Sequence, residues 1–337
     1  MADDLPLYSK ERKVLLGTQQ TNRFDLGVFC GEKERTVKIA TDKCYQVDDP
    51  DLFKTLIQKP VVAWPTIALL ITAYAIFGAS TFAFVTGAFP LLWAILFNAL
   101  ASYLAFTVAH DATHSAVSSN RNLNDWAGRA SIILLEPGPF FSLFRFIHMQ
   151  HHRHTNDESK NPDAYCGTGP KWLLPFKWLT LDYAYFKHYL KRDLCVKRPK
   201  SERREFFISM LLAASSITAV TLVGWLKYYL LLFFLPTRIA KLIIALAFDF
   251  LPHYPHEATA KEDPYKSTSN RVGMEWLLTP LFVFQNYHLV HHLYPTVPFF
   301  RYIKVWNARK SYHEAKNPST VHAFGLNPAG SPRRSNR

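Results

Sequence analysis

Histidine is the residue type with the clearest chemical potential in this chain, and it is clustered. Eight of the 14 histidines fall into three short sets. The sets are His110 and His114 in AHDATHS, His148, His151 and His152 in HMQHHRHT, and His288, His291 and His292 in NYHLVHHLYP. Residues at i, i+3 and i+4 lie on one face of a helix. Each set therefore directs two or three imidazoles the same way.

Imidazoles gathered in this way predict a transition-metal site. Imidazole nitrogen binds iron, copper, zinc and nickel, and eight or more donors exceed the roughly four ligands of a single zinc ion. Two six-coordinate ions, each keeping one position for O2 or water, suit this number of donors. A ninth ligand is predicted at His253 in DFLPHYPH, with His256 as the alternative. A lone buried histidine is more often a hydrogen-bonded core residue, but three spaced sets favour the metal site.

Metal-bound imidazoles usually donate their second N–H to an acceptor, which predicts supporting residues beside the sets. Asp111 and Asp249 are the carboxylates that we expect in this role, and Asp157 and Asp163 also lie next to the motifs. The alternative for these aspartates is an ordinary solvated loop position. A supporting or structural role is expected for His154, His256, His188, His313 and His322.

The histidine sets lie near the ends of long apolar segments. A bilayer core takes roughly 20 apolar residues of helix, and four segments of about this length are present. They are residues 61–85, 91–109, 206–225 and 230–250. Short turns at residues 87–90 and at Lys227 predict two transmembrane hairpins. The fourth segment carries Arg238 and Lys241, which we expect to reach the interface or to line a polar cavity.

The distribution of positive charge predicts how these segments are oriented. Residues 110–205, between the two hairpins, contain 15 Lys and Arg, whereas the two turns contain only Lys227. The positive-inside rule places this segment, both termini and the histidines in the cytoplasm. The predicted fold class is an all-α integral membrane protein, with four transmembrane helices in two hairpins and a cytosolic helical cap that carries the histidine sets. Anionic lipid accounts for the net charge of +13, which no nucleic-acid-binding motif accompanies.

Three regions are predicted along the chain. Residues 1–59 form a polar cytosolic segment without a signal-peptide core, residues 60–316 form the membrane domain, and residues 317–337 form a disordered basic tail. The four cysteines are far apart and include no CxxC pair. They argue against a disulfide framework, a thiolate zinc site and a built-in iron–sulfur cluster.

The motifs HDATH, HMQHH and HLVHH, in this order and spacing, resemble those of the membrane fatty acid desaturase/hydroxylase superfamily, and the similarity covers residues 61–302. The resemblance implies a non-haem di-iron centre and O2 as the oxidant. It also implies electrons from a separate ferredoxin or cytochrome b5 with its reductase, since no HPGG-like haem-binding segment is present. The family's ligands map onto the eight clustered histidines and, for the ninth, onto His253. FDFLPHYP and QNYHLVHHLYPTVPFFRY are similar to the carotenoid ring hydroxylase branch.

The implied reaction is oxidation of an unactivated C–H bond in a long lipid. We expect a fatty acyl chain that gains a double bond or a hydroxyl group, with a carotenoid ring hydroxylase as the alternative. The oligomeric state stays open. A histidine-rich metal transporter is a remote alternative, because it needs ionisable residues along a path at mid-membrane, and a zinc hydrolase lacks its HExxH motif. A substrate tunnel is predicted to open at five rings that are otherwise ordinary core residues, namely Phe140, Phe141, Phe144, Phe299 and Phe300.

Overall fold

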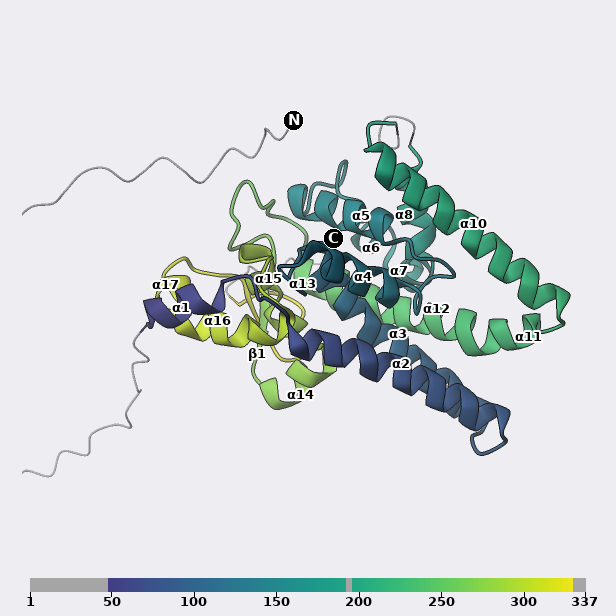
Figure 1. The fold of residues 1–337 in the computed structure, drawn as a ribbon. Coiled ribbons are helices and arrows are strands. Elements are labelled where there is room, and N and C mark those ends of the chain that lie inside the picture. Colours follow the sequence, from purple (N-terminus) through teal and green to yellow (C-terminus); the bar gives the residue numbers. More distant parts are fainter. Residues whose placement is uncertain (1–47, 192–195, 330–337) are drawn as a thin grey trace, which may run out of the picture. The chain divides into compact units, whose positions relative to one another are not determined.

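The computed structural model describes residues 48–191 and 196–329 of the 337-residue chain. These residues are mostly helical, with one pair of three-residue strands (Figure 1). Four stretches in the described part are long and apolar enough to cross a membrane. They are α2 (Trp64–Val85), α3 (Leu91–Thr113), α10 (Lys200–Leu222) and a composite stretch at Leu226–His253. The prediction of an all-α membrane protein with four spanning helices is confirmed.

The helices α2 and α3 pack against each other and are joined by the turn at residues 86–90. Neither contains a charged residue before Asp111, near the end of α3. One buried polar side chain, Asn98, lies at the centre of their contact. It bonds to the Ser80 hydroxyl of α2, and its Nδ2 donates to the backbone oxygen of Leu232 at 2.7 Å. Asn98 therefore ties α3 to the fourth stretch as well as to α2.

The fourth spanning stretch is not a uniform α-helix. It consists of α11 (Leu226–Tyr229), the π-helical segment η2 (Leu230–Phe234), α12 (Leu235–Ile244), the π-helical segment η3 (Ala245–Phe250) and α13 (Leu251–His253). Each π-helical segment comes directly before a helix with a proline in its first turn, Pro236 or Pro252. Proline has no N–H for the α-helical ladder, which favours such local rearrangement. The stretch extends past the predicted residues 230–250 and ends at His253.

The two cations of the fourth stretch contact acidic side chains of neighbouring segments. Lys241 Nζ lies 2.6 Å from a carboxylate oxygen of Glu136 and 2.7 Å from one of Asp182, and Arg238 forms a bidentate pair with Asp182. All four side chains are largely buried. Of the two expected arrangements, reaching the interface or lining a polar cavity, the second is the nearer one, because Lys241, Glu136 and Asp182 all line a small cavity and are joined in an ionic network. This network joins α12 to α8 (Leu181–Tyr189) and to the loop after α4.

Short helices form most of the chain between α3 and α10. They are α4 (Arg121–Ile132), α5 (Phe141–Arg153), α6 (Ala164–Gly167), η1 (Lys171–Leu173), α7 (Leu174–Leu179) and α8. Both α4 and α5 pack against α3, and α8 packs against α5. The break between α4 and α5 includes Pro137, Gly138 and Pro139, as expected from their low helix propensity.

The C-terminal region carries the third histidine set on a short helix. Its elements are β1 (Asn270–Val272), α14 (Glu275–Leu281), η4 (Gln285–Tyr287), α15 (His288–Leu293), η5 (Phe299–Arg301), α16 (Tyr302–Ala308), α17 (Lys310–Glu314) and β2 (Thr320–His322). β1 and β2 pair in parallel. The guanidinium group of Arg271 donates to the carbonyl oxygens of Ala323 and Gly325, both at 2.6 Å.

The ends of the chain differ in part from the prediction. Within the tail predicted from residue 317 onward, β2 pairs with β1, and Arg271 of β1 donates hydrogen bonds to the residues after β2. Residues 330–337 lie outside the described residues, as do residues 1–47 of the predicted N-terminal segment. The rest of that segment includes α1 (Pro50–Leu56), which packs against α16. Its Phe53 also contacts the ring of Tyr294, the C-terminal cap residue of α15.

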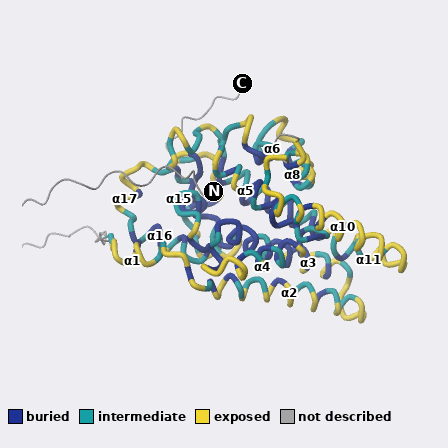
Figure 2. The backbone as a smooth tube through the Cα atoms, turned by 45° about the horizontal axis from the view of Figure 1, so that its top comes forward, coloured by how far each residue is buried: buried dark blue, intermediate teal, exposed yellow. Residues whose placement is uncertain are grey.

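Burial follows the division between the spanning helices and the site (Figure 2). The C-terminal part of α3 and the helices α5 and α15 are largely buried, whereas α2 and α10 are mostly exposed. The exposed side chains on α2 and α10 are large and apolar, for example Phe82 and Leu222. Extended apolar surface of this kind suits contact with lipid chains.

Candidate metal centre

The first histidine set lies where α3 ends. His110 is in the last turn of the helix and His114 is its C-terminal cap residue. The two are four residues apart, so their rings point from the same side of the helix. Both side chains are buried. Two imidazoles therefore lie at the C-terminal end of one spanning helix.

The other two sets lie on α5 and α15. Along α5, His148, His151 and His152 occupy the last two turns. Along α15, which has only six residues, His288 comes first and His291 and His292 come near the end. The i, i+3, i+4 spacing brings the three rings of each helix to one side, as predicted.

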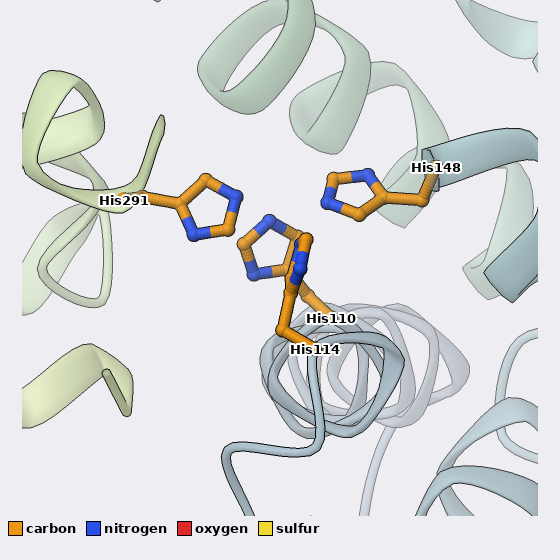
Figure 3. A group of neighbouring side chains, drawn as sticks. All are labelled: His110, His114, His148 and His291. Atoms are coloured by element: carbon orange, nitrogen blue, oxygen red, sulfur yellow. The ribbon is translucent and has the colours of Figure 1, made fainter. Parts of the chain in front are cut away.

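Four of these rings form the first group of candidate ligands. One nitrogen from each of His110, His114, His148 and His291 lies within 4.8 Å of the others. Figure 3 shows the four rings converging, with His110 and His114 on one helix and His148 and His291 approaching from either side. The ring centroids of His110 and His291 are 4.1 Å apart. Three segments that are far apart in the sequence therefore meet at one point.

A second group contains His151, His253, His288 and His292, again with one nitrogen from each within 4.8 Å of the others. The Nε2 atom of His288 lies 3.2 Å from that of His253 and 3.1 Å from that of His292. The Nε2 atoms of His151 and His292 are 3.3 Å apart. The residue at the end of the fourth spanning stretch, His253, is thus placed with the clustered histidines, whereas His256 is not part of either group.

The ninth ring, His152, lies between the two groups. Its Nε2 atom is 2.8 Å from that of His291 and 3.1 Å from that of His148, both in the first group. Its ring also stacks on that of His292, in the second group, with centroids 4.2 Å apart. All nine predicted ligands are brought together, in an arrangement with two halves.

Burial disfavours the charged form of five of these imidazoles. It lowers the pKa of His114 to about 3 and the pKa of His148, His152, His288 and His291 well below the usual value, and neighbouring rings add to the shift. A neutral imidazole offers a lone pair to a metal ion. Several of these ring nitrogens lie at about hydrogen-bond distance from one another. Both nitrogens of His110 are buried without a hydrogen-bond partner among the described residues. A pair of metal cations would satisfy such nitrogens.

The second ring nitrogen of three candidate ligands has an acceptor or hydroxyl partner. His151 Nδ1 lies 2.9 Å from an Asp163 carboxylate oxygen and 3.2 Å from the Asn161 side-chain oxygen. His288 Nδ1 lies 2.8 Å from Gln285 Oε1. These contacts fix the ring orientation, as supporting residues do in metal sites.

A third supporting contact is made by a tyrosine. The Tyr302 hydroxyl lies 3.1 Å from Nδ1 of His291, and burial raises the pKa of Tyr302 well above its usual value. Sequence reasoning did not select Asn161, Gln285 or Tyr302, and it gave Asp163 no more weight than its neighbours. The signal for Gln285 is its position one turn before His288, whereas Asn161, Asp163 and Tyr302 come close only through the fold.

The residues predicted as supporting partners make other contacts. Asp111 accepts hydrogen bonds from the Thr66 hydroxyl at 3.1 Å and from the Phe299 backbone N–H at 3.3 Å. Asp249 lies 3.8 Å from the thiol of Cys166, a buried free cysteine. Neither has a hydrogen bond to an imidazole among the described residues. The acceptor roles predicted for these two aspartates are thus taken by Asp163 and its neighbours.

His154 and His256, two of the five histidines expected in a supporting or structural role, lie outside both groups. His154 is the C-terminal cap residue of α5, outside both groups. His256 stacks at 6.5 Å from the ring of His253, and burial lowers its pKa to about 4. Asp157 accepts bonds from Ser159 in an exposed turn. The other three cysteines lie outside the described residues.

An apolar cavity of about 60 Å³ adjoins the first group of histidines. Phe140 and Phe144, two of the five rings predicted at a tunnel mouth, line it. Phe106 also lines it, and the rings of Phe106 and Phe144 lie 6.0 and 5.9 Å from those of His110 and His148. These two phenylalanines separate the cavity from the imidazoles.

The remaining three predicted rings lie elsewhere. Phe141 faces Arg145, whose guanidinium carbon is 4.4 Å from the ring centroid. Phe299 packs against Phe284, and Phe300 lies below Arg301. None of these three rings lines the cavity.

The sequence of this chain is similar to those of known enzymes. The model of the fatty acid desaturase family matches residues 87–322, which is more than half of the chain and includes all three histidine sets. The beta-carotene ketolase of Paracoccus sp. (strain N81106 / MBIC 01143) is 29% identical over 199 residues, covering 58% of this chain and 71% of that protein. The beta-carotene ketolase of Paracoccus sp. (strain PC1) is 29% identical over 219 residues, covering 64% and 79%. This chain therefore belongs to the membrane fatty acid desaturase/hydroxylase superfamily and has features of its carotenoid branch.

Proposed function

We propose that this protein is a di-iron oxygenase that uses O2 to oxidise a C–H bond in the end ring of a carotenoid. The observation that carries the proposal is the meeting of nine imidazoles, from α3, α5, α13 and α15, in two groups. Each group offers four nitrogen donors within 4.8 Å, and His152 supplies the ninth between them. This number suits two ions, and the superfamily supports iron as the metal.

The carotenoid substrate is supported by the two similar beta-carotene ketolases. A fatty acyl lipid is the second candidate, supported by the family whose model matches the chain. Both are long apolar molecules, and the cavity beside His110 and His148 has apolar walls formed by residues such as Ile132, Leu135 and Ile244. A metal transporter is not favoured, because both the family and the similar proteins are those of enzymes.

In this proposal, the nine histidines hold the ions and their partners fix the rings. Asp163, Gln285 and Tyr302 orient His151, His288 and His291 through the nitrogen that faces away from the ion. Phe106 and Phe144 keep water out of the apolar side of the site. Bound iron would supply the activation of O2, which none of the amino-acid side chains present can perform.

The proposed stoichiometry defines what must enter the site. In hydroxylation, a C–H bond becomes a C–OH group, one oxygen atom of O2 enters the product, and the other leaves as water with two electrons and two protons. The electrons come from an external donor, for which we propose a ferredoxin or cytochrome b5 with its reductase. By the positive-inside rule, we propose that the site and both termini face the cytoplasm.

Production of the enzyme in a bacterial host that makes β-carotene, together with a matched reductase system, tests the proposal. Mass spectrometry of the extracted carotenoids and fatty acids distinguishes the products. A carotenoid that gains one oxygen atom indicates hydroxylation, and one that gains one oxygen and loses two hydrogens indicates a ketone. New unsaturation in fatty acids alone would identify the second candidate. If enzyme loaded with iron oxidises neither the carotenoid nor the fatty acids, both candidate functions are contradicted.

A further inference from the structure

A wide polar cleft of about 910 Å³ opens beside the histidines, on the other side of α5 from the apolar cavity. Two candidate ligands, His152 and His292, form part of its lining. Ser142, Gln150 and Ser201 add neutral polar groups. Apolar side chains such as Phe146 and Met149 also form part of the lining. A hydrocarbon is still not favoured here, because the charged and polar groups would lose water without gaining partners.

The two histidines in the cleft are the most accessible of the nine. Seven of the candidate ligands are buried, whereas His152 and His292 are only partly buried. His152 contacts nitrogens of the first group, and His292 contacts nitrogens of the second. The cleft therefore reaches each half of the site through a single imidazole ring, and the two rings stack on each other.

Positive charge dominates the walls of the cleft. Three acidic side chains line it, Asp125, Glu202 and Glu205. Five arginines line it, namely Arg121, Arg129, Arg145, Arg153 and Arg198. Arg129, Arg145 and Arg198 pair with these carboxylates. Arg121 is 3.9 Å from Asp125 with a largely exposed side chain, and exposed Arg153 forms no ion pair with an acidic residue in the described part of the chain.

We propose that this cleft is the docking surface for an acidic one-electron carrier protein, and that electrons enter the site through His152 and His292. The inference rests on the proposed function, since it concerns how that oxygenase is reduced. A carboxylate-rich surface on the carrier complements the excess of arginine, and such complementarity mainly raises the rate of encounter. Two reduced carriers each lose one electron per turnover, which supplies the two electrons that O2 reduction needs.

Charge reversal at the rim tests the docking surface. Arg121→Glu and Arg153→Glu are compared with Lys304→Glu, an equivalent charge change at an exposed residue of α16 that does not line the cleft. With a purified plant-type [2Fe–2S] ferredoxin and its reductase as the donor, each arginine variant is expected to raise the KM for ferredoxin about fivefold. The double variant is expected to lose most of the dependence of that KM on salt. Lys304→Glu is expected to leave both unchanged.

A second measurement separates failure of the docking surface from failure of the proposed function. Enzyme is reduced chemically with dithionite, freed of excess reductant, and exposed to O2 with substrate for a single turnover. Product from the wild-type enzyme supports the proposed function without any carrier, and its absence in iron-loaded enzyme contradicts it. If the arginine variants keep the wild-type KM for ferredoxin, or raise the KM for the lipid in place of it, the docking proposal is overturned. A KM for ferredoxin close to that of the wild type in Arg153→Lys, which keeps the positive charge, supports the docking proposal.

Discussion

At the scale of single residues, the site depends on which nitrogen of each ring faces inward. Imidazole can bind a metal ion through only one nitrogen at a time in this arrangement, so the other must be satisfied by the protein. For His151 and His288 these partners are acidic or amide oxygens within 3.2 Å. Substituting a residue that binds or orients such a ring should therefore affect iron binding much more than substituting a residue of the same type nearby.

His152 and His154 give the simplest comparison of this kind. His152 lies between the two groups, whereas His154 lies at the end of α5 outside them. We expect His152→Ala to abolish turnover and to lower bound iron below two ions per chain, and His154→Ala to retain both. Iron analysis of purified protein and product analysis check this. Equal losses in both variants would contradict the assignment of His152.

Asp163 and Asp249 form a second matched pair. Only Asp163 contacts an imidazole, at 2.9 Å from His151 Nδ1, while Asp249 lies near Cys166. We expect Asp163→Leu to weaken iron binding about 10- to 100-fold, the usual cost of losing a supporting acceptor. Asp249→Leu should have an iron affinity close to that of the wild type. Competition with a chelator measures both affinities, and the reverse order would show that Asp249 is the supporting residue.

At the scale of secondary-structure elements, two sets of contacts hold helices that lie next in the chain to those carrying the ligands. The ionic network of Lys241, Arg238, Asp182 and Glu136 fixes α12, which precedes His253. In the C-terminal region, His313 of α17 stacks on Trp306 of α16 with centroids 4.8 Å apart. Each set of contacts makes a prediction about stability.

Lys241→Met removes one cation from a largely buried network and leaves the Glu136 carboxylate without its partner. Loss of one member of such a pair costs about 3–5 kcal/mol, so we expect a clearly lower unfolding temperature in detergent. Adding Glu136→Gln removes the unpaired charge and should recover much of the loss. A double variant no more stable than Lys241→Met alone would show that the network does not act in this way.

His313 predicts how stability depends on pH. Burial lowers its pKa to about 4, Arg309 lowers it further and Asp48 opposes the shift. The unfolded chain, with a pKa near 6.5, binds the proton more readily. The contribution of the neutral ring is therefore present above pH 6.5 and is lost as the pH falls towards 4, by up to about 3 kcal/mol. Unfolding temperatures of the wild type should fall more steeply across this window than those of His313→Phe, and parallel curves would contradict the prediction.

At the scale of the whole molecule, the spanning helices and the metal centre depend on each other. Two spanning stretches end in candidate ligands, His110 with His114 and His253. The remaining ligands lie on α5 and α15, which the fold packs beside these ends. The centre is thus positioned at one end of the spanning helices, where an apolar substrate and a soluble donor can both reach it.

The orientation of the chain in the membrane is tested by cysteine labelling. In a variant without native cysteines, Ala88→Cys lies in the turn between α2 and α3, and Ser159→Cys lies in the exposed turn after α5. The positive-inside rule predicts that a membrane-impermeant maleimide labels position 88 in intact cells and position 159 only after lysis. The opposite pattern would place the metal centre outside the cytoplasm.

The sequence by itself determined the four spanning segments and the nine candidate ligands. Both follow from local rules: an uncharged run long enough to cross a bilayer, and a helical spacing that puts imidazoles on one face. His253 is the exception, because no second histidine shares its helical face within α13. It is predicted from its place at the end of the fourth segment, with His256 as the alternative, and the resemblance favours His253.

Only the tertiary structure decided how the nine rings divide, with His110 and His291 in one group and His253 and His288 in the other. It also placed Asp163 and Tyr302 next to imidazole nitrogens, which Asp111 and Asp249 do not contact, and placed Lys241 in an ionic network. These outcomes depend on contacts between segments more than 10 residues apart, for example the 141 residues between His151 and His292. Local spacing contains no information about such contacts, because they are set by how the helices pack.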